Sequence, residues 1–339
     1  MKTDELLKKL CNEFGASSYE DRVMDLVENS LKEEYKELDF YRPGTGSLVA
    51  KYGKGGKKVA FFAHIDEIGV VVSNIVDEEF ARVEMIGGVD ARTLIAKKVK
   101  FVTKHGEKIG VVGMLAPHLQ AADSRGKSPS FDELFVDFSF SGGTKDISVG
   151  DIGYIDFEAV ELQNKMISAK ALDNRVGAVV IAKALDYLKE YKFDGELYLC
   201  FNRGEEIGLV GAKGMAYEVN PDYAIVVDVA FGNENIPHME TLKIGEGPAI
   251  ATGAPITPKV FDDLTKIAEE NNLNFQLEVA ASRSGTEADI VQITRTGIAT
   301  GLVSVPILNM HSPVEVVDVK DIEAAAKLLA IFAVKEVRE

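Results

Sequence analysis

Apolar residues in the first forty positions recur at the spacing of amphipathic helices. Residues 6–14 place leucines and a phenylalanine on one face, and residues 23–31 place apolar side chains four positions apart, which predicts two packing helices. Two short apolar runs follow at residues 47–52 and 58–63, separated by the glycine-rich turn 53–56. These runs predict a hairpin whose second strand is buried.

The pattern changes over residues 70–162, where short strand-like runs are joined by glycine-rich and charged turns. No long helical pattern occurs in this stretch. We therefore expect a small β-barrel domain, inserted as residues 70–164 into a larger unit. Its strand-like runs lie at residues 70–73, 82–85, 99–102, 109–114 and 134–138.

After residue 165, helical and strand patterns alternate. The helical patterns cover residues 174–189, 210–217, 259–271, 287–294 and 319–337, and the strands cover residues 166–169, 196–202, 223–228, 275–279 and 298–303. This alternation is typical of an α/β fold with helices on both faces of a mostly parallel sheet. The buried strand 58–63 fits the same sheet. We therefore predict one discontinuous α/β domain made of residues 1–69 and 165–339.

Composition narrows the classes of function. The chain has 38 Lys and Arg against 54 Asp and Glu, a net charge of −16, and such an acidic surface repels nucleic acid. Cys11 and Cys200 are the only cysteines, so neither a disulfide framework nor a thiolate zinc cluster can form. The absence of Trp counts modestly against a polysaccharide-binding cleft.

Nothing in the sequence indicates a membrane or an export signal. The longest uncharged stretch, residues 296–314, is interrupted by glycines and prolines, so it is not a lipid-spanning helix. The first ten residues mix Lys and Glu with leucines and lack the apolar core of a signal peptide. We expect a cytoplasmic location and no membrane partner.

Ionisable residues gather where apolar strands end, which is where ligands bind in open α/β sheets. They are His64 and Asp66 after strand 58–63, Asp173 at the start of a helix just after strand 166–169, Glu205 and Glu206 after strand 196–202, Asp228 at the end of strand 223–228, and His311 after the apolar run 298–310. Two imidazoles and three carboxylates, with no thiol, suit a pair of divalent ions such as zinc, cobalt or manganese. The sequence therefore indicates a two-metal hydrolytic site with a carboxylate shared between the ions.

Each of these residues alone has a simpler interpretation. Glu205 and Glu206 could form a solvated turn, and Asp173 could cap a helix. Their common position at strand ends is what favours a site. Three other histidines fall in turns and loops and are interpreted as structural or surface residues: His105, His118 and His238.

Four segments around the candidate residues carry a more specific pattern. They read Ala-His-Ile-Asp-Glu-Ile-Gly at residues 63–69, Lys-Ala-Leu-Asp-Asn-Arg at 170–175, Glu-Glu-Ile-Gly-Leu-Val-Gly-Ala at 205–212 and Met-His-Ser-Pro-Val-Glu at 310–315. Their order and spacing resemble the tetrahedral aminopeptidase family over essentially the whole chain, insert included. That family has a zinc-exopeptidase-like fold and includes glutamyl and deblocking aminopeptidases and proteins labelled cellulase or endoglucanase.

The resemblance implies a role for each candidate residue. The implied metal ligands are His64 and Asp228 for one ion, Glu206 and His311 for the other, and Asp173 as the bridge between them. Glu205 resembles the general base, and Asp66 resembles the carboxylate that orients His64. The implied cofactors are two divalent ions per subunit, zinc or cobalt first and manganese next.

The implied activity is that of an aminopeptidase that removes the N-terminal residue from short peptides. A water held by both metals would attack the first peptide carbonyl, with Glu205 taking its proton. The implied assembly is a tetrahedral dodecamer built from dimers, with the inserted β domain serving oligomerisation and access.

Two departures and two rival functions remain open at this stage. Many relatives have a second Asp where this chain has Asn174, and they read Gly-Gly-Thr-Asp where this chain reads Ser-Gly-Thr-Glu at residues 284–287; the second change is expected to alter the substrate pocket. A glycoside hydrolase would use two carboxylates and no metal. An inactive binding homologue would keep the fold without the activity.

Overall fold

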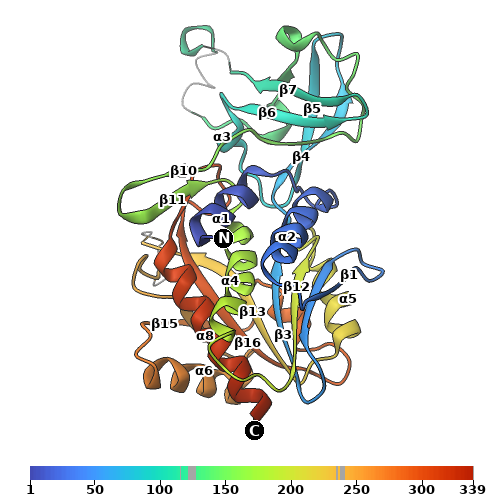
Figure 1. Ribbon diagram of the computed structural model, residues 1–339. Helices are drawn as coiled ribbons and strands as arrows, with labels where there is room; N and C mark the ends of the chain where they lie inside the picture. The colour runs from blue at the N-terminus through green and yellow to red at the C-terminus, as the bar shows by residue number, and fades with distance from the viewer. Residues whose placement is uncertain (115, 121–126, 234–235, 237–240, 339) are drawn as a thin grey trace.

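The computed structural model describes residues 1–114, 116–120, 127–233, 236 and 241–338. Figure 1 shows a small β-barrel at one end of a larger α/β part. The helices α1 (Thr3–Asn12) and α2 (Asp21–Glu34) lie near the junction of the two. His238 lies outside the described residues.

An eleven-stranded sheet forms the centre of the larger part. Its four central strands run parallel, and the strands on both flanks join them by antiparallel pairing. The predicted α/β class is confirmed. In pairing order the strands are β1 (Asp39–Tyr41), β2 (Leu48–Gly53), β12 (Glu196–Asn202), β3 (Lys58–His64), β13 (Tyr223–Phe231), β16 (Ala299–Leu308), β17 (Glu315–Asp318), β11 (Met166–Ala169) and β10 (Val160–Glu161), with β14 (Ala249–Gly253) beside β16 and β15 (Gln276–Ala280) beside β14.

The strands β2 and β3 are not neighbours in this sheet. β12 lies between them, antiparallel to β2 and parallel to β3. The predicted hairpin of residues 47–52 and 58–63 is therefore wrong. β3 instead gains two parallel partners, β12 and β13, from sequence more than 130 residues away, as a strand buried on both faces requires.

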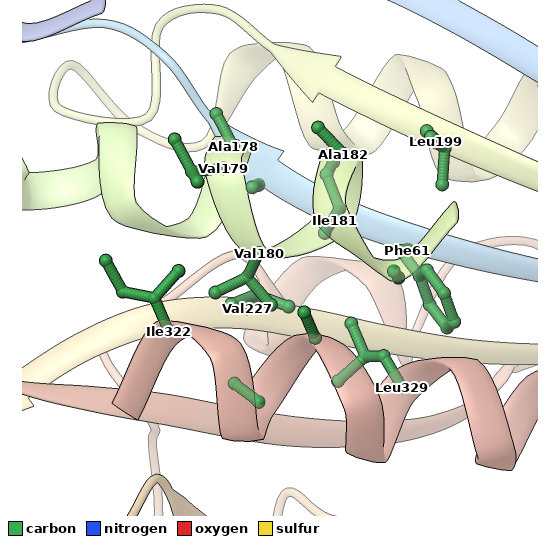
Figure 2. Close-up of a cluster of buried hydrophobic side chains, with 14 of the residues drawn as sticks. Phe61, Ala178, Val179, Val180, Ile181, Ala182, Leu199, Val227, Ile322 and Leu329 are labelled. Atoms are coloured by element: carbon green, nitrogen blue, oxygen red, sulfur yellow. The ribbon is translucent and has the colours of Figure 1, made fainter. Parts of the chain in front are cut away.

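Helices cover both faces of the sheet. The helices α1, α2, α4 (Leu172–Leu188), α6 (Pro258–Glu270) and α8 (Val319–Arg338) pack on one face, and α5 (Val210–Val219) and the short α7 (Ala288–Val291) pack on the other. Successive residues of β3 alternate between these layers, with Phe61 in the first and Phe62 in the second. Figure 2 shows Val180 of α4, Val227 of β13 and Ile322 of α8 meeting in the first layer. Among the described residues, none of the helices combines the length and apolar character needed to cross a membrane.

Six antiparallel strands close the barrel, and its core is apolar. In barrel order they are β4 (Gly69–Ile75), β5 (Phe80–Ile86), β8 (Val136–Asp137), β7 (Gly106–Val112), β6 (Lys98–Thr103) and β9 (Ile152–Ile155). Within the described part of this stretch, the only α-helix is the four-residue α3 (Ala91–Leu94), as the sequence predicted. Short 3-10 turns lie at Pro117–Leu119, Phe131–Glu133, Ser139–Ser141 and Gln163–Lys165.

Apolar packing seats the barrel on the connection between α1 and α2. Phe14 and Ala16 of that connection are buried against Ile152 and Tyr154 of β9, and the Phe14 and Tyr154 ring centroids are 4.8 Å apart. This cluster buries large aromatic surface between the two parts of the chain. The barrel is therefore held at a defined position above the carboxyl ends of the central strands.

Candidate metal centre

Parallel strands bring the candidate residues to one edge of the sheet. β12, β3, β13 and β16 run in the same direction, so their carboxyl ends meet there. α4 begins at the same edge, directly after β11. The side chains that gather there are His64 at the end of β3, Asp66 in the loop after it, Glu205 and Glu206 after β12, Asp228 in β13, His311 after β16, and Asp173 in the first turn of α4.

Asp173 lies between the two imidazoles. Its Oδ1 is 3.1 Å from His64 Nε2, and its Oδ2 is 3.2 Å from His311 Nε2. Two ligands bound to one tetrahedral ion at about 2.1 Å lie roughly 3.4 Å from each other. Each pair therefore has the separation expected of neighbours around a shared cation, and one carboxylate faces two separate cation positions.

The donor atoms at this edge form two groups. In each group, one donor atom per residue lies within 4.8 Å of the others; the groups are His64, Glu205 and Asp228, and Asp173, Glu206 and His311. Within them, His64 Nε2 is 3.8 Å from Asp228 Oδ1, and His311 Nε2 is 3.5 Å from Glu206 Oε1. Imidazole nitrogens with carboxylate oxygens are the donor set that zinc and its neighbours take in proteins.

The pKa values of the cluster indicate that its carboxylates lack enough positive charge nearby to stabilise their ionised forms. Burial raises the pKa of Glu206 to about 8, and the charge of Asp173 adds to this shift. Burial also raises the pKa of Asp228 well above its ordinary value, whereas contact with Asp173 raises the pKa of His311 to about 9. Divalent cations would neutralise these crowded carboxylates, so the residues fit a pair of such ions.

Asp66 connects one imidazole to the loop that carries both glutamates. It is fully buried and accepts hydrogen bonds from the backbone N–H groups of Glu205 at 3.0 Å and Glu206 at 3.2 Å. Ser17 Oγ donates to it at 2.6 Å. His64 Nδ1 lies 3.3 Å from Asp66 Oδ1, although their alignment falls short of a hydrogen bond. Asp66 therefore fixes the backbone of the segment that carries Glu205 and Glu206.

A buried ion cluster, to which the sequence analysis gave no role, connects the loops that carry candidate residues to α1. Glu67, in the loop after β3, lies 2.7 Å from Lys170 Nζ and 3.4 Å from the Arg175 guanidinium. Arg175 also donates to the carbonyls of Ile65 at 2.6 Å and of Leu10. The network therefore holds the segment that contains Asp66 against the start of α4, where Asp173 lies.

Two further buried carboxylates, Glu20 and Glu315, bond to the backbone of other segments that carry candidate residues. Glu20 accepts from the Arg203 guanidinium at 2.7 and 2.9 Å and from the backbone of Gly204 at 3.1 Å, which fixes the loop just before the glutamate pair. Glu315 accepts from the backbone N–H groups of His311 at 2.8 Å and Asp173 at 3.2 Å. Sequence reasoning assigned no role to either residue: Glu20 lies away from the strand ends, and Glu315 appeared only as the last residue of the segment 310–315.

Two of the residues that depart from the family motifs, Asn174 and Glu287, are fully buried. Asn174 donates to the carbonyl of Val227 at 2.8 Å, a bond that a carboxylate could not make. Glu287 is fully buried and accepts from Asn202 at 2.9 Å, so its own side chain has no surface with which to line an open pocket.

Two of the three remaining histidines lie away from the cluster. His105 occupies the exposed turn between β6 and β7, and His118 is exposed in the 3-10 turn Pro117–Leu119. Their surroundings agree with their interpretation as surface residues.

Comparison with known proteins places the chain in a family. The sequence model of the M42 glutamyl aminopeptidase family matches residues 46–328. The chain is 34% identical to the lysyl aminopeptidase of Pyrococcus furiosus, over 96% of this chain and 94% of that protein. It is similar in structure to aminopeptidase APDkam598 of the archaeon Desulfurococcus kamchatkensis, with a TM-score of 0.88 and 36% identity over 98% of this chain and 94% of that chain. It is also similar to the TET1 peptidase of Pyrococcus horikoshii, with a TM-score of 0.85 and 29% identity over 98% and 99% of the two chains. The resemblance to tetrahedral aminopeptidases is confirmed, and the chain belongs to the M42 glutamyl aminopeptidase family.

Proposed function

We propose that this chain is a cytoplasmic dinuclear metallo-aminopeptidase that removes the N-terminal residue from short peptides. The observation that carries the proposal is Asp173, whose two carboxylate oxygens face His64 and His311 at 3.1 and 3.2 Å. The names of the relatives support peptide hydrolysis, since two of them are aminopeptidases and one is a peptidase. The donor set supports the metal dependence.

The proposed ligands are taken from the two donor groups, with Asp173 shared because it lies between the two imidazoles. His64 and Asp228 would hold one ion, Glu206 and His311 the other, and Asp173 both. The ions would be zinc or cobalt, with manganese as the third choice. When bound, they supply a Lewis acid for the scissile carbonyl and lower the pKa of a water molecule toward neutrality. The proton of that water then needs an acceptor among the residues of the site.

Glu205 is the proposed proton acceptor and not a ligand. Its Oε2 lies 4.0 Å from His64 Nε2, against 3.1 Å for Asp173 Oδ1, so Asp173 is better placed to share a cation with that imidazole. Glu205 nevertheless belongs to the same donor group as His64 and Asp228, so its carboxylate lies beside the proposed position of the water molecule. A base so placed can take a proton from the attacking water and give it to the leaving amine.

The same carboxylates explain why the cut would fall at the first peptide bond. The free amine of a peptide N-terminus would lie close to the proposed ions and to the carboxylates of the two donor groups, whose donor atoms lie within 4.8 Å of one another in each group. An internal peptide segment has no free amine to place there. The site therefore favours an exopeptidase over an endopeptidase.

The first prediction concerns metal removal. Chelation or mild acid should abolish hydrolysis of aminoacyl amides, and zinc, cobalt or manganese should restore it, because every proposed ligand is a His or a carboxylate that protonation releases. The measurement is turnover of a panel of aminoacyl amides by the metal-free and the reconstituted protein. Full activity in protein shown by elemental analysis to be metal-free would disprove the proposal.

The same preparation distinguishes the rival functions. A glycoside hydrolase would cleave a cello-oligosaccharide without metal, using two carboxylates across a sugar ring. We expect no such cleavage, because the carboxylates here are grouped around two imidazoles. Sugar cleavage without amide hydrolysis would favour the glycosidase, and two bound ions without either activity would favour an inactive homologue.

The second prediction concerns assembly. Pyrococcus horikoshii TET1 can assemble into a tetrahedron or a large octahedral shell, and we expect this chain to form a dodecamer built from dimers. The inserted residues 70–164 are the proposed oligomerisation and access domain. The net charge of −16 would keep so large a particle soluble. Sedimentation velocity should show one species near twelve times 36.9 kDa. A fully active monomer at high concentration would contradict the prediction.

A further inference from the structure

The barrel reaches the candidate metal centre through one short turn. Gly87 and Gly88 follow β5 and precede α3, and the carbonyl oxygen of Gly88 lies 3.1 Å from His311 Nδ1. A carbonyl oxygen only accepts hydrogen bonds, so the imidazole must carry its proton on Nδ1. In the neutral imidazole, which is the form that binds a cation, Nε2 then carries the lone pair, and it faces Asp173 and Glu206.

The turn also leaves no room for side chains at these two positions. A Cβ atom on Gly88 would lie 2.5 Å from His311 Nδ1, and one on Gly87 would lie 2.9 Å from Glu206 Oε2. Gly87 has a φ of +70°, which also favours glycine. Gly88 has no such constraint, so the space beside His311 is what restricts residue 88.

These contacts fall on one of the two donor groups. His311 and Glu206 belong to the same group, together with Asp173. The other group comes from β3, the loop after β12 and β13, all within the α/β part. The two proposed cation positions thus have different surroundings. Residues of one donor group contact the inserted barrel, whereas those of the other come from the α/β part alone.

The position of the turn depends on how the barrel is seated. Phe14 and Ala16 pack against β9, and Arg22 of α2 pairs with Glu107 of the barrel at 2.7 Å. β5 ends at Ile86, which packs against the same apolar cluster as Phe14. The turn therefore follows directly from a strand that is fixed to the α/β part.

We infer that the inserted barrel completes one of the two metal sites, with the Gly87–Gly88 turn holding His311 in the tautomer and orientation that bind a divalent cation. This inference rests on the proposed function, in which His311 is a ligand. Gly88 is a positioning residue, because it acts on the cation only through the imidazole. Hydrogen bonds to the second nitrogen of a ligating His usually contribute 10- to 100-fold to metal affinity.

The test compares Gly88→Ala with Gly113→Ala. Gly113 lies in the same barrel, has no positive φ and has open space where its Cβ would be, so it controls for the change itself. Zinc binding is measured by calorimetry and elemental analysis, and the visible spectrum of the cobalt form reports each site. Wild type and Gly113→Ala should bind two ions per subunit. Gly88→Ala should show about 10- to 100-fold weaker binding at one site and unchanged binding at the other.

A second variant keeps the test decisive if Gly88→Ala does not fold. Replacement of His311 by Nδ1-methylhistidine removes the proton donated to Gly88 and leaves Nε2 free, so it should weaken the same site selectively. Two ions bound with wild-type affinity in both variants would overturn the inference and leave the proposed function standing. A wild-type protein that binds no divalent ion would overturn both.

Discussion

Glu205→Gln is expected to keep both metal ions and to lose about 10²- to 10⁴-fold in turnover, the usual contribution of a general base. The amide has the shape of the carboxylate but does not accept a proton at neutral pH. The proposed ligands stay in place, because Asp173 and not Glu205 is the carboxylate at 3.1 Å from His64 Nε2. The measurement is metal content by elemental analysis beside the turnover of an aminoacyl amide.

Glu206→Gln is the matched variant, since it makes the same change one residue further along. Asp66 accepts from the backbone of both glutamates, so neither substitution removes the bonds that fix the loop. Glu206→Gln should weaken one metal site, because an amide is a poorer ligand for a divalent cation than a carboxylate, and excess metal should restore activity in part.

The pair of variants can also reverse the assignment. If Glu205→Gln loses metal while Glu206→Gln keeps both ions and is inert, the two roles are exchanged. If both variants remain fully active, the cluster is not the site of hydrolysis. Metal content and turnover of the two variants thus separate a role in metal binding from a role in proton transfer.

The convergence of the ligands could be predicted from the sequence, because it follows from strand direction alone. Parallel strands place their carboxyl ends at one edge, so His64 and Asp228 meet without any knowledge of side-chain packing. The alternation of helix and strand after residue 165 was enough to predict that direction. The β-barrel was predictable for a related reason, since short strands without helices leave few other ways to bury an apolar face.

Strand pairing and the supports of the ligands could not be predicted in this way. The hairpin prediction failed because β2 and β3 lie close in sequence, while the partner that separates them, β12, comes from much later in the chain. Glu20 and Glu315 act on backbone N–H groups of other segments, and a backbone group leaves no mark in the sequence. A glycine in the sequence, such as Gly88, indicates at most a turn, and the contact of its carbonyl with His311 becomes visible only in the structure.

These supports share a physical design that links fold stability to the site. Glu20, Glu315 and Arg175 are buried charged groups whose partners are backbone atoms or charges of other segments, so the loss of a partner leaves a buried charge without compensation. Arg175 is the buried charge with the most widely spread partners. Its side chain is fully buried and donates to carbonyls of α1, of the loop after β3 and of the loop after α1. Removing it should reveal how much of the fold depends on this network.

Arg175→Met should lower the free energy of unfolding by about 3 to 5 kcal/mol, the cost of breaking a buried ion pair from one side. Methionine fills similar volume, but it leaves the carbonyl of Ile65 without the guanidinium donor, and Glu67 loses one of its two counter-charges and keeps Lys170. Arg22→Met is the control, because it removes an exposed pair with Glu107 that is worth only about 0 to 1 kcal/mol. Urea unfolding followed by circular dichroism measures both. Equal losses in the two variants would mean that the buried network contributes no more than a surface pair, and the ligand loops would then owe their positions to the apolar core alone.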